Sequence, residues 1–144
     1  MTEIKSNHYV KHNVSFKEYK IHKYVYNLNI VHIPKIISYD KKTKILTLAR
    51  IHNLSISDSY GELLTDVPTD IISKIRDIIK TLLNHGIMYI DITGYNFIEH
   101  NNIIWIIDFE HATYVANHLE RENNKYYFIY DFIQGVDYWN PDFL

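Results

Sequence analysis

The sequence has 144 residues and a mass of 17.3 kDa, with 47% apolar residues, 22% charged residues and a formal net charge of −2. This length and composition predict one globular domain and exclude a disordered or collagen-like chain. The absence of cysteine excludes disulfides, thiolate zinc sites and cysteine nucleophiles, while the absence of a dense Lys/Arg run argues against nucleic acid as the main partner.

The compartment is predicted from the same features. Residues 1–10 are polar, and no apolar run approaches the ~20 residues that span a bilayer, so we expect no membrane partner and a cytoplasmic location. The abundance of Ile, Asn, Lys and Tyr is typical of AT-rich genomes, including those of large DNA viruses. Some parasites share this composition, so a host cell is the expected setting only for a viral source, and the expected location is cytoplasmic in either case.

The first third of the chain predicts a strand, a helix and a hairpin in that order. Residues 8–11 have the alternating pattern of a short strand. Residues 15–28 predict an amphipathic helix with Ser15 as its N-cap, because apolar residues recur at helical spacing. The β-prone runs 34–39 and 44–50 are separated by a polar turn and predict a β-hairpin.

The remainder predicts a mainly helical part. Residues 52–68 are polar and turn-rich and are interpreted as a connection. Isoleucines and leucines at helical spacing predict a helix over 70–85, with Gly86 just past its end. The apolar runs 87–90 and 103–107 are interpreted as two buried strands that flank a loop in a hairpin. A last helix is predicted over residues 120–134, before an aromatic tail.

The segment from His85 to Glu110 carries the chemical signal. Asp91 is followed five positions later by Asn96, and Asp108 opens an Asp-Phe-Glu tripeptide twelve residues further on. This order resembles the catalytic and metal-binding loops of the protein-kinase-like superfamily. The resemblance implies that Asp91 orients an attacking hydroxyl and that Asn96 and Asp108 hold Mg²⁺ against the phosphates of ATP. Unrelated turn residues are the alternative reading of the same spacing.

A second, softer resemblance lies upstream. Lys11 in Tyr9-Val-Lys11 resembles the strand lysine that holds the nucleotide phosphates, and Glu18 on the next helix resembles its ion-pair partner. Solvated surface residues are an equally weighted reading of Lys11 and Glu18. The segment 33–39 resembles the corresponding entry strand of aminoglycoside and choline phosphotransferases, and residues 50–54 then correspond to the interlobe hinge where adenine stacks. Glu3 and Lys5 are weaker competitors for the ion pair.

Several positions depart from ordinary protein kinases. The sequence contains no Gly-x-Gly-x-x-Gly, and about eight residues precede Tyr9, so we expect no glycine-rich lid over the phosphates. Tyr89 stands where the catalytic-loop His is usual, Thr93 where a Lys is usual, and Glu110 where a Gly is usual. These differences favour the atypical and small-molecule kinases. Among the nine histidines, His111 is interpreted as a solvated residue outside the catalytic set, and no tight metal-ligand cluster is seen.

The resemblance implies an α+β, protein-kinase-like fold in a single minimal domain of residues 1–144. Its reduced small lobe of strand, helix and hairpin would cover about 1–52, and its truncated helical large lobe, with a catalytic-loop hairpin, about 53–144. The implied function is ATP- and Mg²⁺-dependent phosphorylation of a hydroxyl on a protein or small molecule. Alternatives are a pseudokinase that binds without transfer and an interaction protein. Tyr138, Trp139 and Phe143 are expected to plug the large lobe, or alternatively to form a homodimer contact.

Overall fold

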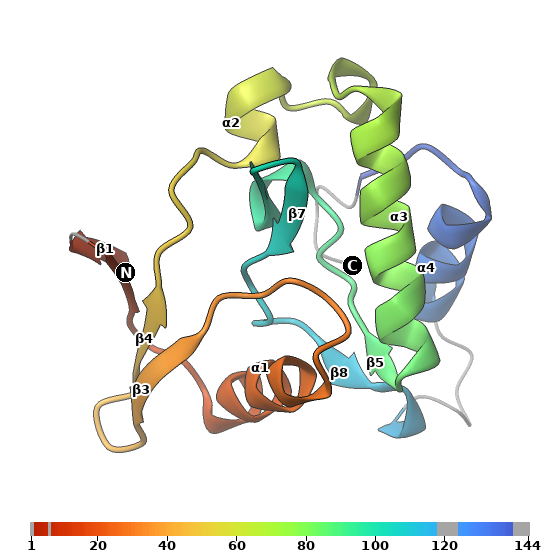
Figure 1. Ribbon diagram of the computed structural model, residues 1–144. Helices are drawn as coiled ribbons and strands as arrows, with labels where there is room; N and C mark the ends of the chain where they lie inside the picture. The colour runs from red at the N-terminus through yellow and green to blue at the C-terminus, as the bar shows by residue number, and fades with distance from the viewer. Residues whose placement is uncertain (1, 6, 118–123, 140–144) are drawn as a thin grey trace.

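The computed structural model describes residues 2–5, 7–117 and 124–139 (Figure 1). Over these residues the chain is α+β, with small antiparallel sheets and four α-helices. Figure 1 shows the largest sheet at one side of the molecule, helices α3 and α4 at the other, and α1 at the bottom between them. None of the described helices is both long and apolar enough to cross a membrane.

The largest sheet has four antiparallel strands in the order β1-β2-β4-β3. The strands are β1 (Thr2–Lys5), β2 (His8–Lys11), β3 (Ile36–Asp40) and β4 (Ile45–Ala49). The predicted strand and hairpin are confirmed, and β1 is an additional edge strand that pairs with β2. Lys11 lies opposite Leu46 in the sheet. This register holds the lysine backbone in a paired, central strand.

Helix α1 (Phe16–Leu28) is capped by the residue before it and the residue after it. The Ser15 hydroxyl accepts a hydrogen bond from the Glu18 amide at 3.1 Å, which satisfies one of the unpaired N–H groups of the first turn. Asn29 ends the helix in the left-handed conformation at φ 52°. The buried face carries Glu18, Ile21, His22 and Val25. Half of the buried positions of this helix are therefore polar.

Helix α3 (Thr69–Asn84) packs beside α4 (Asn124–Gln134) and buries only apolar side chains. Those side chains recur every three or four residues, as the sequence predicts: Ile71, Ile72, Ile75, Ile79 and Leu82. The last predicted helix is also confirmed over its described residues. Both helices contribute buried side chains to the larger hydrophobic core, together with the segments from β5 to β7.

The predicted hairpin around the Asp91 loop pairs differently in the structure. Strand β5 (Ile87–Met88) pairs with β8 (Thr113–Tyr114), whereas β7 (Ile103–Ile106) pairs with β6 (Phe97–His100). The expectation that the runs 87–90 and 103–107 form one hairpin is therefore wrong. A two-residue turn closes the real hairpin, with Asn101 and Asn102 at φ 53° and 62°. Asparagine tolerates this left-handed conformation better than most residues.

The connection between the sheet and α3 is more ordered than the sequence suggests. It contains α2 (Ile56–Tyr60), which begins at an N-cap serine, and the short 3₁₀ turn η1 (Leu64–Asp66). Two further 3₁₀ turns, η2 (Gly94–Asn96) and η3 (Val115–Asn117), follow later in the chain. Ser55, which caps α2, forms an isolated bridge to Ile98 of β6. The connection thereby ties the sheet side of the molecule to the β6–β7 hairpin.

The aromatic tail is only partly within the described residues. Trp139 is buried in the larger core and stacks on Phe132 of α4, with ring centroids 6.4 Å apart. Tyr138 is 52% exposed and contacts Phe128 edge to face. Trp139 thus packs inward as the plugging interpretation expects. Phe143 lies outside the described residues, and the homodimer contact stays a prediction.

Candidate active site

Strand β2, helix α1 and the segment after β7 meet at Lys11. Its Nζ lies 2.6 Å from Glu18 Oε2 of α1 and 2.9 Å from Asp108 Oδ1, in the segment that follows β7. Strand β2 fixes the lysine backbone, and the capped first turn of α1 directs Glu18 toward it. The structure therefore brings together three of the five predicted site residues in one charged cluster.

The electrostatics of this cluster keep the lysine charged. Burial lowers the pKa of Lys11, but the nearby carboxylates of Asp108 and Glu18 outweigh burial, so its pKa lies above the usual 10.5. Burial raises the pKa of Glu18, and the Lys11 ammonium only partly offsets this. A largely buried ammonium between two carboxylates is a positive charge held in a fixed position.

The Asp91 loop is held by its own backbone and by a close approach to α2. The Asn96 amide donates to the Asp91 carbonyl at 2.9 Å, and the Asn96 N–H donates to the Thr93 carbonyl at 3.0 Å. A Cβ built on Gly94 would lie 2.2 Å from the Ser57 hydroxyl, which is closer than any side chain allows. Glycine is needed at this position because the loop backbone packs directly on α2.

Tyr89 links this loop to Asp108. Its buried hydroxyl donates to the Asp108 carbonyl and is hydrogen-bonded by the Asn96 side chain. Its ring lies edge to face against Phe109, with centroids 5.6 Å apart. Burial, followed by the charges of Asp108 and Asp91, raises the pKa of Tyr89 well above its usual range, so the phenol stays protonated as a donor. The sequence departure at Tyr89 is therefore a structural connection within the site.

Asp91 has a partner that the sequence did not suggest. His111 Nδ1 lies 2.5 Å from Asp91 Oδ2, whereas Asp91 Oδ1 is buried and has no hydrogen-bond partner among the described residues. Burial raises the pKa of Asp91, and the hydrogen bond from His111 lowers it in part. The expectation that His111 is merely solvated is thus incomplete. Its place three residues after Asp108 was the only available signal.

A second histidine contacts the site from α1. His22 Nε2 lies 2.8 Å from the Pro34 carbonyl, and its ring meets Phe109 edge to face at 5.3 Å. Burial lowers the pKa of His22 to about 4. Because an imidazole with this pKa is neutral at pH 7, Nε2 is the protonated nitrogen that donates to the carbonyl. Helix α1 therefore holds the Asp-Phe-Glu segment through Phe109 as well as through Asp108.

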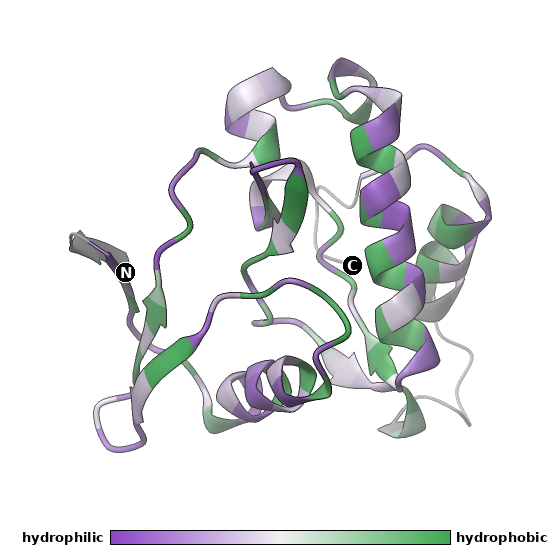
Figure 2. Ribbon diagram, viewed as in Figure 1, coloured by the Kyte–Doolittle hydropathy of each residue, from purple (hydrophilic) through white to green (hydrophobic). Residues whose placement is uncertain are grey.

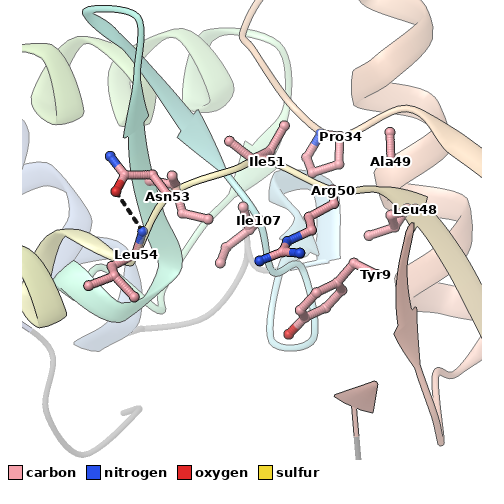
Figure 3. Close-up of a pocket in the computed structure, with 10 residues that line it drawn as sticks. Tyr9, Pro34, Leu48, Ala49, Arg50, Ile51, Asn53, Leu54 and Ile107 are labelled. Carbon is pink, nitrogen blue, oxygen red and sulfur yellow. Dashed lines mark hydrogen bonds between the residues drawn. The ribbon is translucent and has the colours of Figure 1, made fainter. Parts of the chain in front are cut away.

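A cavity of about 140 Å³ opens beside this cluster, where β4 leads into the connection (Figure 3). Figure 3 shows side chains of the sheet, of the connecting segment 50–54 and of Ile107 around one space. The residues that line it are mostly apolar: Tyr9, Pro34, Leu48, Ala49, Arg50, Ile51, Asn53, Leu54, Ile98 and Ile107. Ile107 immediately precedes Asp108. The shape and lining suit a flat, apolar ring system next to a charged site.

The described residues contain no group of three or more His, Asp or Glu side chains placed to hold a metal by themselves. Asn96 and Asp108 are nevertheless tied together, because the Ile107 N–H donates to the Asn96 carbonyl at 3.1 Å. Asp108 Oδ1 already accepts from Lys11 and from the Glu110 amide. One amide oxygen and one carboxylate oxygen fit Mg²⁺ when nucleotide phosphates and water complete its shell.

Comparisons with known proteins give similarity to solved structures alone. No protein-family model matches the sequence, and no curated protein matches it. Among solved structures, the choline kinase LicA from Streptococcus pneumoniae is similar to this chain, with 14% sequence identity and a TM-score of 0.43. The similarity covers 94% of this chain and 71% of that one.

Proposed function

We propose that this chain is a reduced, kinase-like phosphotransferase that uses ATP and Mg²⁺ to phosphorylate a hydroxyl group on a protein or a small molecule. The observation that carries the proposal is the contact of Lys11 with both Glu18 and Asp108. These three residues come from a strand, a helix and a loop that are up to 97 positions apart. Chance surface pairing seldom collects a lysine and two carboxylates in a half-buried cluster.

The cavity beside the cluster supports a nucleotide as the phosphoryl donor. An adenine ring would lie between the sheet side chains Tyr9 and Leu48 and the segment 50–54, with its phosphates directed past Ile107 toward Lys11. Apolar walls on both sides of a ring, with peptide groups along one edge, are the usual elements of a purine site. The charged end of the ligand would then meet the only ammonium that two acidic side chains hold in place among the described residues.

The remaining residues supply the chemistry of transfer. Lys11, held by Glu18, would contact the nucleotide phosphates, while Asn96 and Asp108 would offer oxygen ligands to Mg²⁺. When bound, Mg²⁺ would neutralise charge on the phosphates. Asp91 would serve the acceptor hydroxyl. Tyr89 holds Asn96 and Asp108 next to each other because its hydroxyl contacts both residues.

A binding module that keeps the site without transferring phosphate is the second candidate. Burial of Asp91 favours it, because the residue is only 3% exposed and its Oδ2 contacts His111. The two candidates share the nucleotide site and differ at Asp91. Nucleotide binding and phosphate transfer are therefore separate measurements.

Thermal unfolding with and without ATP plus Mg²⁺ tests the nucleotide site. Ligand at about a hundred times its Kd stabilises the folded state by roughly 2.7 kcal/mol, so the wild type should show a clear rise in melting temperature. Asp108→Asn should lose the rise, because it removes a metal oxygen and the carboxylate beside Lys11. Asp131→Asn, an exposed carboxylate change on α4, should keep it. No rise in the wild type at millimolar ATP contradicts both candidates.

Transfer is measured with labelled ATP and a small panel of acceptors: choline, an aminoglycoside and a serine- and threonine-containing peptide. Phosphorylated product with the wild type supports the phosphotransferase. A thermal shift without any product, together with no release of phosphate from ATP, would favour the binding module.

A further inference from the structure

We propose that His111 is the catalytic base of this site and that Asp91 acts through it, so that the proton of the acceptor hydroxyl passes to His111 Nε2. This inference rests on the proposed phosphotransferase function and assigns its proton-transfer step. It departs from the sequence interpretation, in which Asp91 meets the acceptor itself.

The exposure of the two side chains is the first observation. The Asp91 side chain is 4% exposed, and the His111 side chain is 47% exposed. One carboxylate oxygen, Oδ2, contacts the imidazole at 2.5 Å, and the other, Oδ1, is buried. An acceptor arriving from solvent therefore meets the imidazole first. A buried carboxylate behind an exposed imidazole is an arrangement suited to general-base catalysis.

The hydrogen bond also determines which nitrogen of His111 is basic. An ionised carboxylate accepts hydrogen bonds and donates none, so Nδ1 must carry the proton that points at Asp91. In the neutral ring the lone pair then belongs to Nε2, at the opposite side of the imidazole. When Nε2 takes a second proton, the Asp91 carboxylate stabilises the resulting imidazolium.

The backbone around His111 is anchored on both sides. Asp108 Oδ1 accepts from the Glu110 amide at 2.9 Å, and the Phe109 carbonyl accepts from the Ala112 amide at 3.1 Å. Phe109 and Ala112 are buried, and β8 follows at once and pairs with β5. These tight turns fold the chain back, so His111 lies over Asp91 while remaining three residues from Asp108. His111 is thus held against Asp91 on the turn that follows Asp108.

The step balances as a direct displacement. The acceptor oxygen forms a bond to the γ-phosphorus of ATP, its proton moves to His111 Nε2, and the bond between the γ-phosphorus and the bridging oxygen breaks. ADP leaves with that electron pair, and His111 later releases its proton to water. No oxidant, reductant or further reactant is required.

The deciding experiment compares His111→Asn with wild type in the labelled-ATP assay, using the acceptor that gives product, or water as acceptor if only phosphate release is seen. Asparagine retains a short amide donor toward Asp91 but has no basic nitrogen. We expect turnover to fall by about a hundredfold or more, the usual contribution of a general base. The ATP–Mg²⁺ thermal shift should be unchanged. His85→Asn is the matched control, because His85 is exposed and its Nδ1 also contacts an oxygen, 2.9 Å away.

A second measurement separates catalysis from positioning. His111→Ala should regain turnover when free imidazole is added, because the small molecule can replace the lost base, whereas a merely structural loss would not respond. Turnover of His111→Asn within a few-fold of wild type would overturn the inference. So would an active His111→Ala, or a folded, ATP-binding His111→Ala that imidazole leaves inactive. If the wild type neither binds nor consumes ATP, the proposed function fails first, which is a distinguishable result.

Discussion

Helices α1 and α3 bury faces of opposite character. Figure 2 shows strongly hydrophobic positions along one face of α3 and a largely hydrophilic α1. The buried positions of α3 are all isoleucine or leucine, whereas α1 buries Glu18 and His22 beside Ile21 and Val25. Apolar burial stabilises a fold through the area removed from water, and buried polar groups require specific partners. The difference indicates that α3 supports the core and that α1 serves the site.

The partners of the α1 polar residues agree with this division. Glu18 contacts Lys11, and His22 contacts the Pro34 carbonyl and the Phe109 ring. Both side chains therefore reach residues that flank the charged cluster. Changes in α3 should act on stability alone, and changes in α1 should act on the site or its dependence on pH.

The largest effect is expected from the apolar face of α3. Ile79→Ala removes a fully buried side chain and should lower the free energy of unfolding by about 2–5 kcal/mol, because the packed neighbours collapse only partly into the cavity. Urea or thermal unfolding measures the loss. Lys80→Ala, on the exposed face of the same helix, should change stability by no more than about 0.5 kcal/mol. Equal effects from the two changes would contradict the packing assigned to α3.

His22 should give α1 a pH-dependent contribution. Its pKa is about 4 in the folded protein and near 6.5 when unfolded, so the unfolded chain binds more protons between these values. Stability should therefore fall as the pH drops from 6.5 toward 4, by up to roughly 3 kcal/mol from this residue. Urea unfolding of wild type and His22→Gln at several pH values measures the contribution of His22 to the pH dependence of stability.

Comparing wild type with His22→Gln also cancels the contributions of Glu18 and Asp91, which both proteins contain. The raised pKa values of these two carboxyl groups increase stability as the pH falls, opposite to the effect of His22. The His22→Gln variant should show a shallower loss of stability between pH 6.5 and 4 than the wild type. The exposed substitution His85→Gln should leave the wild-type pH dependence intact. Identical pH profiles for wild type and His22→Gln would show that His22 is not buried as a neutral donor.

The smallest change in stability, with the sharpest change in function, is expected at Glu18. Glu18→Gln keeps the shape of the side chain and replaces a charge-assisted contact with a neutral one, which should cost about 1 kcal/mol. Lys11 retains Asp108 as a partner. The lysine would then be drawn toward Asp108, and the ATP–Mg²⁺ thermal shift should shrink or vanish. Asp77→Asn, on the exposed face of α3, should preserve that shift.

Several elements could be predicted because the information is local. Ser15 and the spacing after it indicate α1, and the isoleucine pattern indicates α3. The β6–β7 hairpin was missed although its signal was present, since Asn101-Asn102 separates two β-prone runs and suits a two-residue turn. Strand β1 and helix α2 are short and carry weak local signals. Strand β1 pairs with the neighbouring β2, and Ser55 at the start of α2 bridges to the distant Ile98.

The candidate site divides in the same way. The resemblance to the kinase-like superfamily singled out Lys11, Glu18, Asp91, Asn96 and Asp108, and these residue types suit phosphate and metal chemistry. The contact of Lys11 with Asp108 joins segments 97 positions apart. The pairing of His111 with Asp91 spans 20 positions and two turns, and no local pattern indicates it.

The sequence by itself determined helices α1, α3 and α4 and the β3–β4 hairpin, because backbone capping and hydrophobic spacing act over a few residues, and it supplied the residues able to carry chemistry. Only the tertiary structure decided that Lys11 lies between Glu18 and Asp108, that Tyr89 joins Asn96 to Asp108, and that His111 covers Asp91. Burial and partner choice depend on which segments pack together. They set the charge state and the reach of each group, and hence which residue can meet a substrate.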